Sequence, residues 1–430
     1  MKSEGHIRKL IAAAAALYFI VPAAAFGSTW TLTGGPGLSV LTDRISNDRT
    51  TLLLLNLSPS FHDPMWDFAL DLDLRWNPAD KTFYSKDWNR DGDWLRPLKR
   101  IEYRTSENTW KVEVAGYSQV TLGSGQVIRG LIGGAETNYR IPGLMVNGAV
   151  SSASFQLFVD RVYDPDVAGA AVTWHPGSSF SLSLEGAVDP AAPLVFSGGF
   201  HGGRPIADDQ KTIRGLGGEA KYRFYDGDIL GIYLMVNAGS LNREARGSGG
   251  GVQVDLDFSN FYRNRLTLRA GTTRCRANYI PAYFDKLYQI ERWGVSGKTL
   301  LQQNPLDAGG ADRDMLSAFM EYGLGDFFNV RAVYDRFDDD SMRRAGLLLD
   351  LSEEDNRGLE VILWSKTLNK SEKLFNIDSN TFVRVSALYK FFPHIFVKGS
   401  YELSWDFVAE KGGAVSTSNI ILAALYTISF

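Results

Sequence analysis

The segment at residues 419–430, N-I-I-L-A-A-L-Y-T-I-S-F, alternates between two kinds of side chain with a period of two. One face is strongly apolar and carries Ile420, Leu422, Ala424, Tyr426, Ile428 and Phe430. The other face carries smaller or mixed residues, among them Asn419, Thr427 and Ser429. Because successive side chains of a strand point to opposite faces, the segment predicts a β-strand with one face in an apolar medium. That medium is the core of a soluble sandwich or a lipid bilayer, and the segment alone allows both.

The same alternation recurs along the chain, most clearly between Trp66 and Trp76. Its apolar face carries Trp66, Phe68, Leu70, Leu72, Leu74 and Trp76, and its polar face carries Asp67, Asp71, Asp73 and Arg75. The two tryptophans are separated by about 33 Å along an untilted strand, or a little over about 20 Å at a tilt near about 45°. This matches the apolar band of a membrane barrel, so the tryptophan pair favours the membrane.

The predicted connections alternate between short turns and long loops, with Gly, Asn, Asp and Pro supplying the turn geometry. Short turns are predicted at residues 58–59, 106–108, 175–177, 226–228, 323–326, 353–356 and 392–394. Long connections are predicted at residues 77–96, 123–141, 189–212, 275–313 and 369–379. This layout predicts an all-β fold, a single antiparallel barrel of about 20 strands, within a range of about 16 to 20. No linker divides residues 26–430, so one barrel is expected to use them all.

The first 25 residues have the pattern of a secretory signal peptide. Lys2, Arg8 and Lys9 give a positive start, residues 10–21 are apolar, and residues 23–25 offer an A-x-A cleavage site. The apolar stretch of 12 residues is shorter than the roughly 20 that a membrane-spanning helix needs. The mature protein is therefore expected beyond the inner membrane.

The composition excludes some classes of protein. After the leader no run of 18 apolar residues occurs, so membrane-spanning helices are not expected. The net charge of −4 gives no reason to expect a nucleic-acid partner. Cys275 is the only cysteine, which rules out an internal disulfide. The aromatic content of 12%, with 18 Tyr and 10 Trp, agrees with aromatic girdles at two membrane interfaces.

With its leader, alternation, unequal loops and terminal Phe430, the chain resembles the Gram-negative outer-membrane β-barrel proteins of the porin-like class. The resemblance covers the whole mature length, but no motif assigns a named family. It implies a place in the outer membrane, surrounded by lipid and lipopolysaccharide. It also implies that the outer-membrane assembly machinery binds the last strand, because an apolar strand ending on Phe430 is similar to the C-terminal signal of that class.

Deletion of Phe430 is expected to leave export to the periplasm intact and to impair insertion into the outer membrane. The last strand must also close the sheet against the first, since an open edge in lipid leaves unpaired backbone groups that each cost several kcal/mol. The measurement is the amount of heat-modifiable, protease-resistant barrel in the outer membrane of the deletion strain. A wild-type amount would contradict this interpretation of the terminus.

The polar faces of the strands are expected to line the lumen, with acidic and basic residues in comparable numbers. The candidate pore-lining residues are Asp67, Asp71, Asp73, Arg75, Arg263, Arg265, Arg269, Glu402 and Asp406. Barrels of about 16 strands or more leave an aqueous space, so these charges can stay hydrated. They either form cross-strand pairs that keep the wall wet and stiff, or they form an acidic strip facing a basic strip that sets selectivity.

One long loop matches the opening of a calcium-binding loop, D-x-N-x-D-G. Its candidate metal ligands are Asp87, Asn89 and Asp91, with Gly92 at the sharp turn. The twelfth position holds Leu98 in place of a bidentate Glu, and no helices are predicted beside it. A solvated acidic loop is the alternative to this calcium site, the only cofactor site that the sequence suggests.

The longest connection contains the aromatic segment N-Y-I-P-A-Y-F at residues 278–284. A segment so rich in aromatic side chains is not expected to extend into water. It is expected to fold into the barrel mouth as a constriction or to dock a partner.

Motifs of the common enzyme classes are missing. The mature histidines, His62, His175, His201 and His394, fall in predicted turns or loops without metal-site spacing. No G-x-S-x-G or C-x-x-C-H sequence occurs, so no enzyme is predicted. Two functions are left: a porin-like channel for ions or small polar solutes, or a structural barrel that sheathes or anchors a partner. Such a partner would belong to a multi-protein envelope complex, for example an exporter or an electron conduit.

Overall fold

The computed structural model describes residues 29–430 except 44–47, 85–87, 89–91, 108, 117–119, 132–140, 197–199, 202–203, 259–263, 294–298, 304–309, 311, 326, 354–356, 369, 377–379, 409–412 and 430. The predicted leader at residues 1–25 and the terminal Phe430 therefore lie outside the described residues. The candidate calcium ligands Asp87, Asn89 and Asp91 lie outside them as well.

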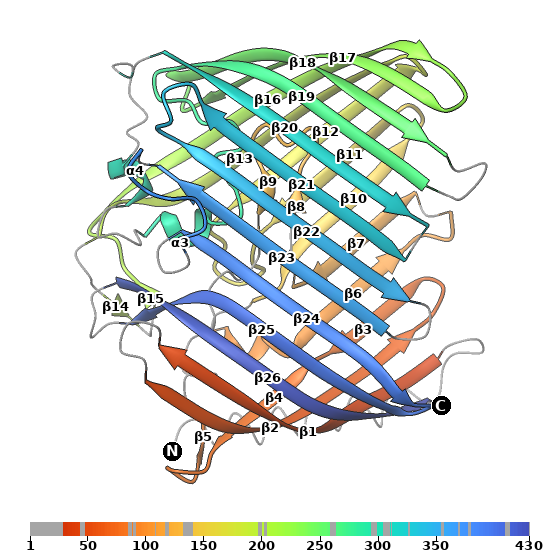
Figure 1. Ribbon diagram of the computed structural model, residues 1–430, viewed down its shortest axis with the longest axis vertical. Helices are drawn as coiled ribbons and strands as arrows, with labels where there is room; N and C mark the ends of the chain where they lie inside the picture. Colours follow the sequence, from red (N-terminus) through yellow and green to blue (C-terminus); the bar gives the residue numbers. More distant parts are fainter. Residues whose placement is uncertain are drawn as a thin grey trace.

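The described residues form one closed antiparallel β-barrel (Figure 1). Its wall strands are β1 Thr29–Asp43, β2 Arg49–His62, β3 Trp66–Leu70, β4 Leu72–Asn77, β6 Leu98–Arg104, β7 Trp110–Ala115, β10 Gly143–Val150, β11 Ala153–Val159, β12 Ala168–Gly177, β13 Phe180–Val195, β16 Asp209–Asp226, β17 Leu230–Leu241, β18 Ala245–Asp257, β19 Asn264–Arg276, β20 Arg313–Leu324, β21 Phe328–Phe337, β22 Arg343–Glu353, β23 Arg357–Thr367, β24 Thr381–Phe392, β25 Ile395–Val408 and β26 Gly413–Ser429. β3 and β4 are two halves of one strand interrupted at Asp71, so the wall has 20 strands, as predicted. β1 pairs with β26 and closes the barrel.

The remaining elements are short and belong to the loops. They are β5 Thr82–Phe83, η2 Asp93–Leu95, β8 Val120–Thr121, β9 Arg129–Leu131, β14 Phe200–His201, β15 Arg204–Pro205, α3 Tyr288–Glu291 and α4 Leu300–Gln303. None of the helices in the described part of the chain has the length and apolar character of a membrane span.

Short turns lie at one end of the barrel and long connections at the other, as predicted. In Figure 1 the C-terminus lies at the short-turn end and α3 and α4 at the opposite end. One predicted turn, at residues 58–59, is wrong, because β2 continues to His62 and Pro59 pairs with Leu32 of β1. On its other side Pro59 lies opposite the break between β3 and β4. β2 pairs with β3 on one side of this break and with β4 on the other. Proline is tolerated there because no hydrogen bond of the ladder needs its missing N–H.

The alternation of residues 419–430 is confirmed over its described part. Leu422 is 56% exposed on the outer face of β26, whereas its neighbours Ala423 and Leu425 are buried. Exposed aromatic residues gather near the short turns, as a girdle at a membrane interface requires. They are Trp66, Trp110, Trp174, Tyr222, Phe224, Tyr225, Tyr389, Phe391 and Phe392.

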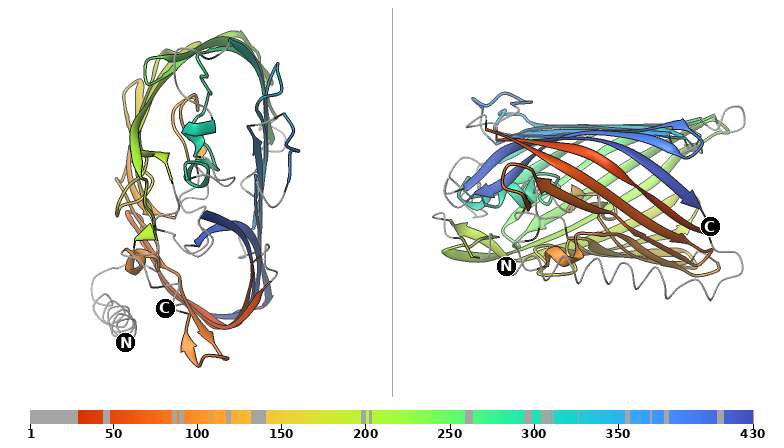
Figure 2. Two further views of the ribbon diagram at one scale, coloured as in Figure 1. Left: turned by 90° about the vertical axis from the view of Figure 1, so that its left-hand side faces the viewer. Right: turned by 90° about the horizontal axis from the view of Figure 1, so that it is seen from below.

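Two loops from the long-connection end fold into the barrel. We call residues 277–293 with 299–303 the plug segment, and residues 120–131 the inner hairpin, because β8 and β9 pair within it. Figure 2 (left) shows the plug segment, in teal, inside the ring of strands. Together with the wall they form the largest apolar cluster of the protein's described part, which places the core inside the barrel, around the two inserted loops.

Candidate functional site

The aromatic segment at residues 278–284 folds into the barrel, as the sequence predicted. Tyr279, Tyr283 and Phe284 are at most 1% exposed, and the ring of Phe284 lies 4.7 Å from that of Tyr288. The plug segment also contacts the inner hairpin, since the Ala282 N–H donates to the Gln126 carbonyl at 2.7 Å. Burying these rings removes a large apolar area from water, which holds the segment inside the lumen.

Glycines in the wall make room for the plug segment. A β-carbon at Gly239 or Gly247 would overlap the ring or hydroxyl of Tyr279. A β-carbon at Gly217 would likewise crowd Gln126 and Val127 of the inner hairpin. These three positions therefore let the backbones of β16, β17 and β18 approach the inserted loops closely.

Arg344 on β22 joins the plug segment to the wall. It is fully buried and its Nε donates to Asp335 of β21 at 2.8 Å. On the plug side its Nη1 lies 3.2 Å from the Asp285 carboxylate. It also donates to the carbonyl oxygens of Pro281 and Ala282, each at 3.1 Å. Removing one partner of such a buried pair leaves the other charge uncompensated, so this contact fixes the loop in place.

A second buried cation, Lys366 on β23, extends this cluster along the plug. Its amine lies 3.0 Å from Asp285 and 2.6 Å from Glu291 of α3. Burial raises the pKa of Glu291 to about 7, although the nearby Lys366 amine opposes that shift. α3 is therefore tied to the wall by a carboxyl group that titrates near neutral pH.

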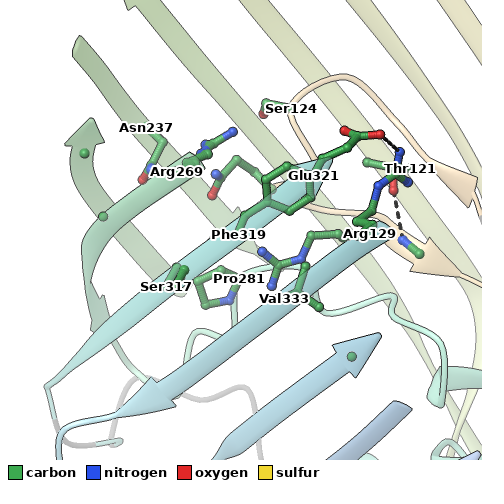
Figure 3. Close-up of a pocket in the computed structure, with 18 of the residues that line it drawn as sticks. Thr121, Ser124, Arg129, Asn237, Arg269, Pro281, Ser317, Phe319, Glu321 and Val333 are labelled. Atoms are coloured by element: carbon green, nitrogen blue, oxygen red, sulfur yellow. Dashed lines mark hydrogen bonds and ion pairs between the residues drawn. The ribbon is translucent and has the colours of Figure 1, made fainter. Parts of the chain in front are cut away.

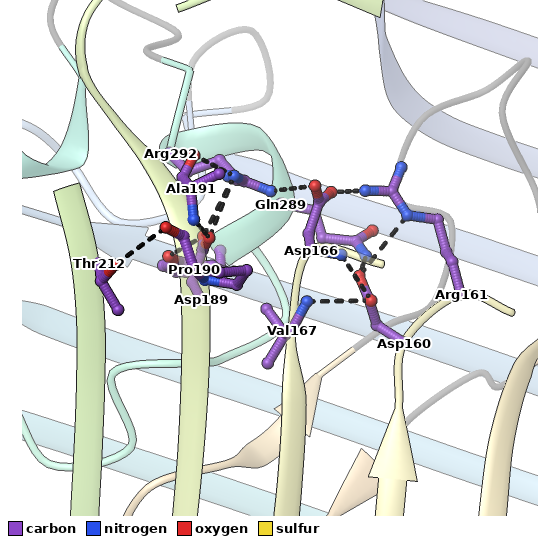
Figure 4. A network of polar contacts seen from close by, with 11 residues as sticks. Asp160, Arg161, Asp166, Val167, Asp189, Pro190, Ala191, Thr212, Gln289 and Arg292 are labelled. Atoms are coloured by element: carbon purple, nitrogen blue, oxygen red, sulfur yellow. Dashed lines mark hydrogen bonds and ion pairs between the residues drawn. The ribbon is translucent and has the colours of Figure 1, made fainter. Parts of the chain in front are cut away.

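A further polar network ties the plug segment to the opposite wall (Figure 4). Arg292 lies 2.5 Å from Asp166 in the β11–β12 loop and 3.2 Å from Asp189 of β13. The Tyr288 hydroxyl donates to Asp189 at 2.7 Å, and the Gln289 amide donates to Asp160 at the same distance. The plug segment is thus anchored by charged contacts on two sides of the barrel.

A cavity of about 370 Å³ remains between the two inserted loops and the wall strands β17–β23 (Figure 3). Its charged lining residues are Arg129, Arg269, Lys286, Arg331 and Glu321. Four of these are basic and one is acidic, so the cavity carries a formal positive charge when all are ionised. Backbone of the inner hairpin and small wall residues supply much of the remaining lining.

The three arginines of the cavity have carboxylate partners. Arg331 lies 2.7 Å from Glu321 on the neighbouring strand. Arg129 pairs with Asp335, and Arg269 pairs with Glu219 of β16. Their positive charge is therefore partly compensated, while their N–H groups still border the cavity.

Of the candidate pore-lining residues, Arg269 alone lies on this cavity within the described part of the chain. Arg265, on the same face of β19, lies 3.6 Å from Asp255. Glu402 pairs with Arg384 at 2.7 Å. Arg263 and the side chain of Asp406 are not among the described residues.

The acidic candidates of β3 and β4 do not line this cavity. Asp67 pairs with Arg100 at 2.5 Å, and the Asn56 amide donates to Asp71 and Asp73 at 2.7 Å each. Asp71 also lies 3.9 Å from Lys398 of β25, which is four strands away along the wall.

The guanidinium of Arg75 lies over the ring of Tyr84 at 5.0 Å. The interrupted strand β3–β4 is the third strand of the wall and β19 the thirteenth, so nine wall strands lie between the acidic and basic strips in either direction. The strips lie on opposite sides of the barrel. Arg265 and Arg269 have carboxylate partners near them, whereas Asp73 accepts a hydrogen bond from the neutral Asn56 amide.

Glu321 and Arg331 were not among the candidate pore-lining residues predicted from the sequence. Side chains alternate between the two faces of β20 and β21, so assigning each residue of these strands to the inner or outer face would have found both. Arg129 and Lys286 lie in the inserted loops, where alternation carries no information. In the described chain no group of three or more His, Cys, Asp or Glu residues is arranged to hold a metal ion.

The exterior of the barrel decides where the protein resides. A closed antiparallel barrel with an apolar outer face, an aromatic girdle and long loops at one end matches the structure of transmembrane barrels. The chain is an outer-membrane β-barrel. Its lipid-facing strands leave the lumen as the place where a function can be sought.

Comparisons with known proteins add little to this assignment. No family model matches the chain, and no curated protein matches it. The solved structures to which it is similar include three proteins of Pseudomonas aeruginosa, one of them the outer membrane protein OpdK. OpdK has 12% identity and a TM-score of 0.33, covering 94% of this chain and 99% of its own. OccK11 (OpdR) has 10% identity and a TM-score of 0.35, and the match covers 94% of this chain and 96% of OccK11. OpdQ has 8% identity and a TM-score of 0.36, and the match covers 94% of this chain and 98% of OpdQ. Likeness at this level assigns neither a family nor a solute.

Proposed function

We propose that the protein is a porin-like channel through which small polar solutes cross the outer membrane, with a preference for anions. The observation that carries this proposal is the cavity inside the closed barrel, lined by four basic residues and one acidic residue. Charged side chains that line a pore set its selectivity, and low-dielectric walls strengthen their field. A permeating anion would pass the N–H groups of Arg129, Arg269 and Arg331.

The size of the cavity limits the solutes to small molecules. The plug segment and inner hairpin border a cavity of about 370 Å³. Pockets for small molecules start at roughly 300 Å³, so ions and small metabolites fit while polymers do not.

The contacts of the plug segment also favour a channel over a barrel that sheathes a partner. A sheath needs a lumen that is open to the partner chain. Here Arg344, Lys366 and Arg292 bind the plug segment to the wall through buried ion pairs. A partner inside the lumen would have to break these contacts.

The double substitution Arg265→Ser and Arg269→Ser is expected to shift the reversal potential in a salt gradient toward cation selectivity. Both side chains lie on the inner face of β19, and Arg269 borders the cavity. The shift should shrink at high salt, because the screening length falls from about 10 Å at 0.1 M to about 3 Å at 1 M. Planar-bilayer recordings of the purified protein measure it.

The matched control changes the same number of charges on the same strand. Arg274 and Arg276 lie at the loop end of β19, are largely exposed and face Asp312. Their double substitution by Ser should leave selectivity nearly unchanged. Equal shifts in both double variants would contradict the cavity as the selectivity site, and a wild-type protein without conductance at any salt concentration would exclude the channel.

A further inference from the structure

Lys286 differs from the other basic residues of the cavity. It belongs to the plug segment, is 2% exposed and lines the cavity. Its amine lies 5.6 Å from the centre of the Trp364 ring, and a side chain at Gly130 would contact its methylene groups. Among the described residues no carboxylate lies within ion-pair distance of this amine, whereas Arg129, Arg269 and Arg331 each have one.

The charges around Lys286 are mostly of its own sign. Arg331 of β21 and Arg384 of β24 repel its charge and Glu360 of β23 attracts it. Each of the two arginines is itself paired with a carboxylate, Glu321 and Glu402 respectively. Burial, followed by the effect of Arg384, lowers the pKa of the Lys286 amine to about 7. The neighbouring Asp285 is already engaged by Arg344 and Lys366 and leaves Lys286 uncompensated.

We propose that Lys286 is the group that binds the permeating anion in the cavity, and that anion binding shifts its amine toward the protonated form, with the proton taken from water. This inference rests on the proposed channel function and names the binding residue of that site. An anion beside the amine offsets the repulsion from Arg331 and Arg384, and so it favours the protonated form. By linkage, protonation strengthens anion binding to the same degree that the anion strengthens protonation. Anion binding is therefore tight below neutral pH and weak above it.

The first test is the anion-to-cation permeability ratio as a function of pH. The wild-type ratio should fall several-fold between about pH 6 and about pH 8, where the amine loses its proton. The Lys286→Met variant should show a low ratio at every pH. The Lys286→Arg variant should keep a high ratio throughout, because a guanidinium stays charged. The matched control, Lys221→Met on β16, removes a lysine that does not line this cavity and should retain the fall.

Burial also raises the pKa of the Glu291 carboxyl on α3 to about 7. The Lys286→Met variant distinguishes the effect of this carboxyl on the permeability ratio from the effect of the Lys286 amine. If the ratio of this variant still falls with pH, another group carries the effect and the proposal fails. If the wild-type ratio is independent of pH, it fails as well.

A second test needs no current. Lysines methylated with ¹³C-formaldehyde report their own titration by NMR, and Lys286 is assigned by the signal that the Lys286→Arg variant lacks. At constant ionic strength its titration midpoint should lie higher in chloride than in gluconate. Equal midpoints would mean simple screening and would overturn the inference. A midpoint shift in a protein that passes no current would instead remove the channel function and leave anion binding at Lys286 supported.

Discussion

Single-channel conductance is expected to rise several-fold when residues 278–311 are replaced by a short glycine-rich turn. The plug segment fills the lumen with buried aromatic side chains, and without it a wall of 20 strands leaves an aqueous channel. The barrel should survive, because Cys275 of β19 pairs with Arg313 of β20 and a short turn can close that hairpin. Planar-bilayer recordings of the deletion and wild-type proteins measure the change.

A point variant at the anchor of the plug gives the matched control. Arg344→Met keeps the full plug segment and removes the contacts to Asp285, Pro281 and Ala282. It should open the channel intermittently, with excursions toward the conductance of the deletion protein. If the deletion protein conducts like the wild type, the plug segment does not limit the passage.

The Leu268→Arg substitution is expected to lower the free energy of unfolding by about 2–4 kcal/mol, the cost of an arginine at the lipid-facing midplane of a barrel. Leu268 lies on the outer face of β19 and is 41% exposed in the absence of lipid. Urea titration of the protein folded into lipid vesicles, followed by heat-modifiable electrophoresis, measures this loss.

The adjacent residue gives a control at the same depth on the other face. Thr267 donates to Asp255 at 2.9 Å and pairs across the strands with Glu321. An arginine at this position would lie between two carboxylates and in contact with water, so Thr267→Arg should cost much less. A larger loss for Thr267→Arg than for Leu268→Arg would invert the assignment of inner and outer faces.

Alternation predicted the wall well, because a strand's period of two is a local property of the chain. It assigned Leu422 to the outer face, where the structure places it. It assigned Arg269 to the inner face, and Arg269 borders the cavity in the structure, while its part in a pore stays a prediction. The same reasoning missed the course of β2 past Pro59, since a proline there is tolerated only opposite the interruption at Asp71. That interruption depends on the pairing of three strands and not on the sequence of one.

The sequence by itself thus determined which side chains alternate between the two faces, which connections are long or short, and the number of strands. Each of these follows from a local pattern of apolar, polar and turn-forming residues. The sequence also placed the aromatic segment at residues 278–284 away from water, since those side chains are too apolar to remain exposed. The cavity was decided by the tertiary structure alone. Arg129 meets Asp335 across 206 positions of the chain, and Lys286 is left without such a partner only because the plug segment lies where it does. Charge pairs between distant segments depend on how the loops fold into the closed barrel, and no local pattern encodes that arrangement.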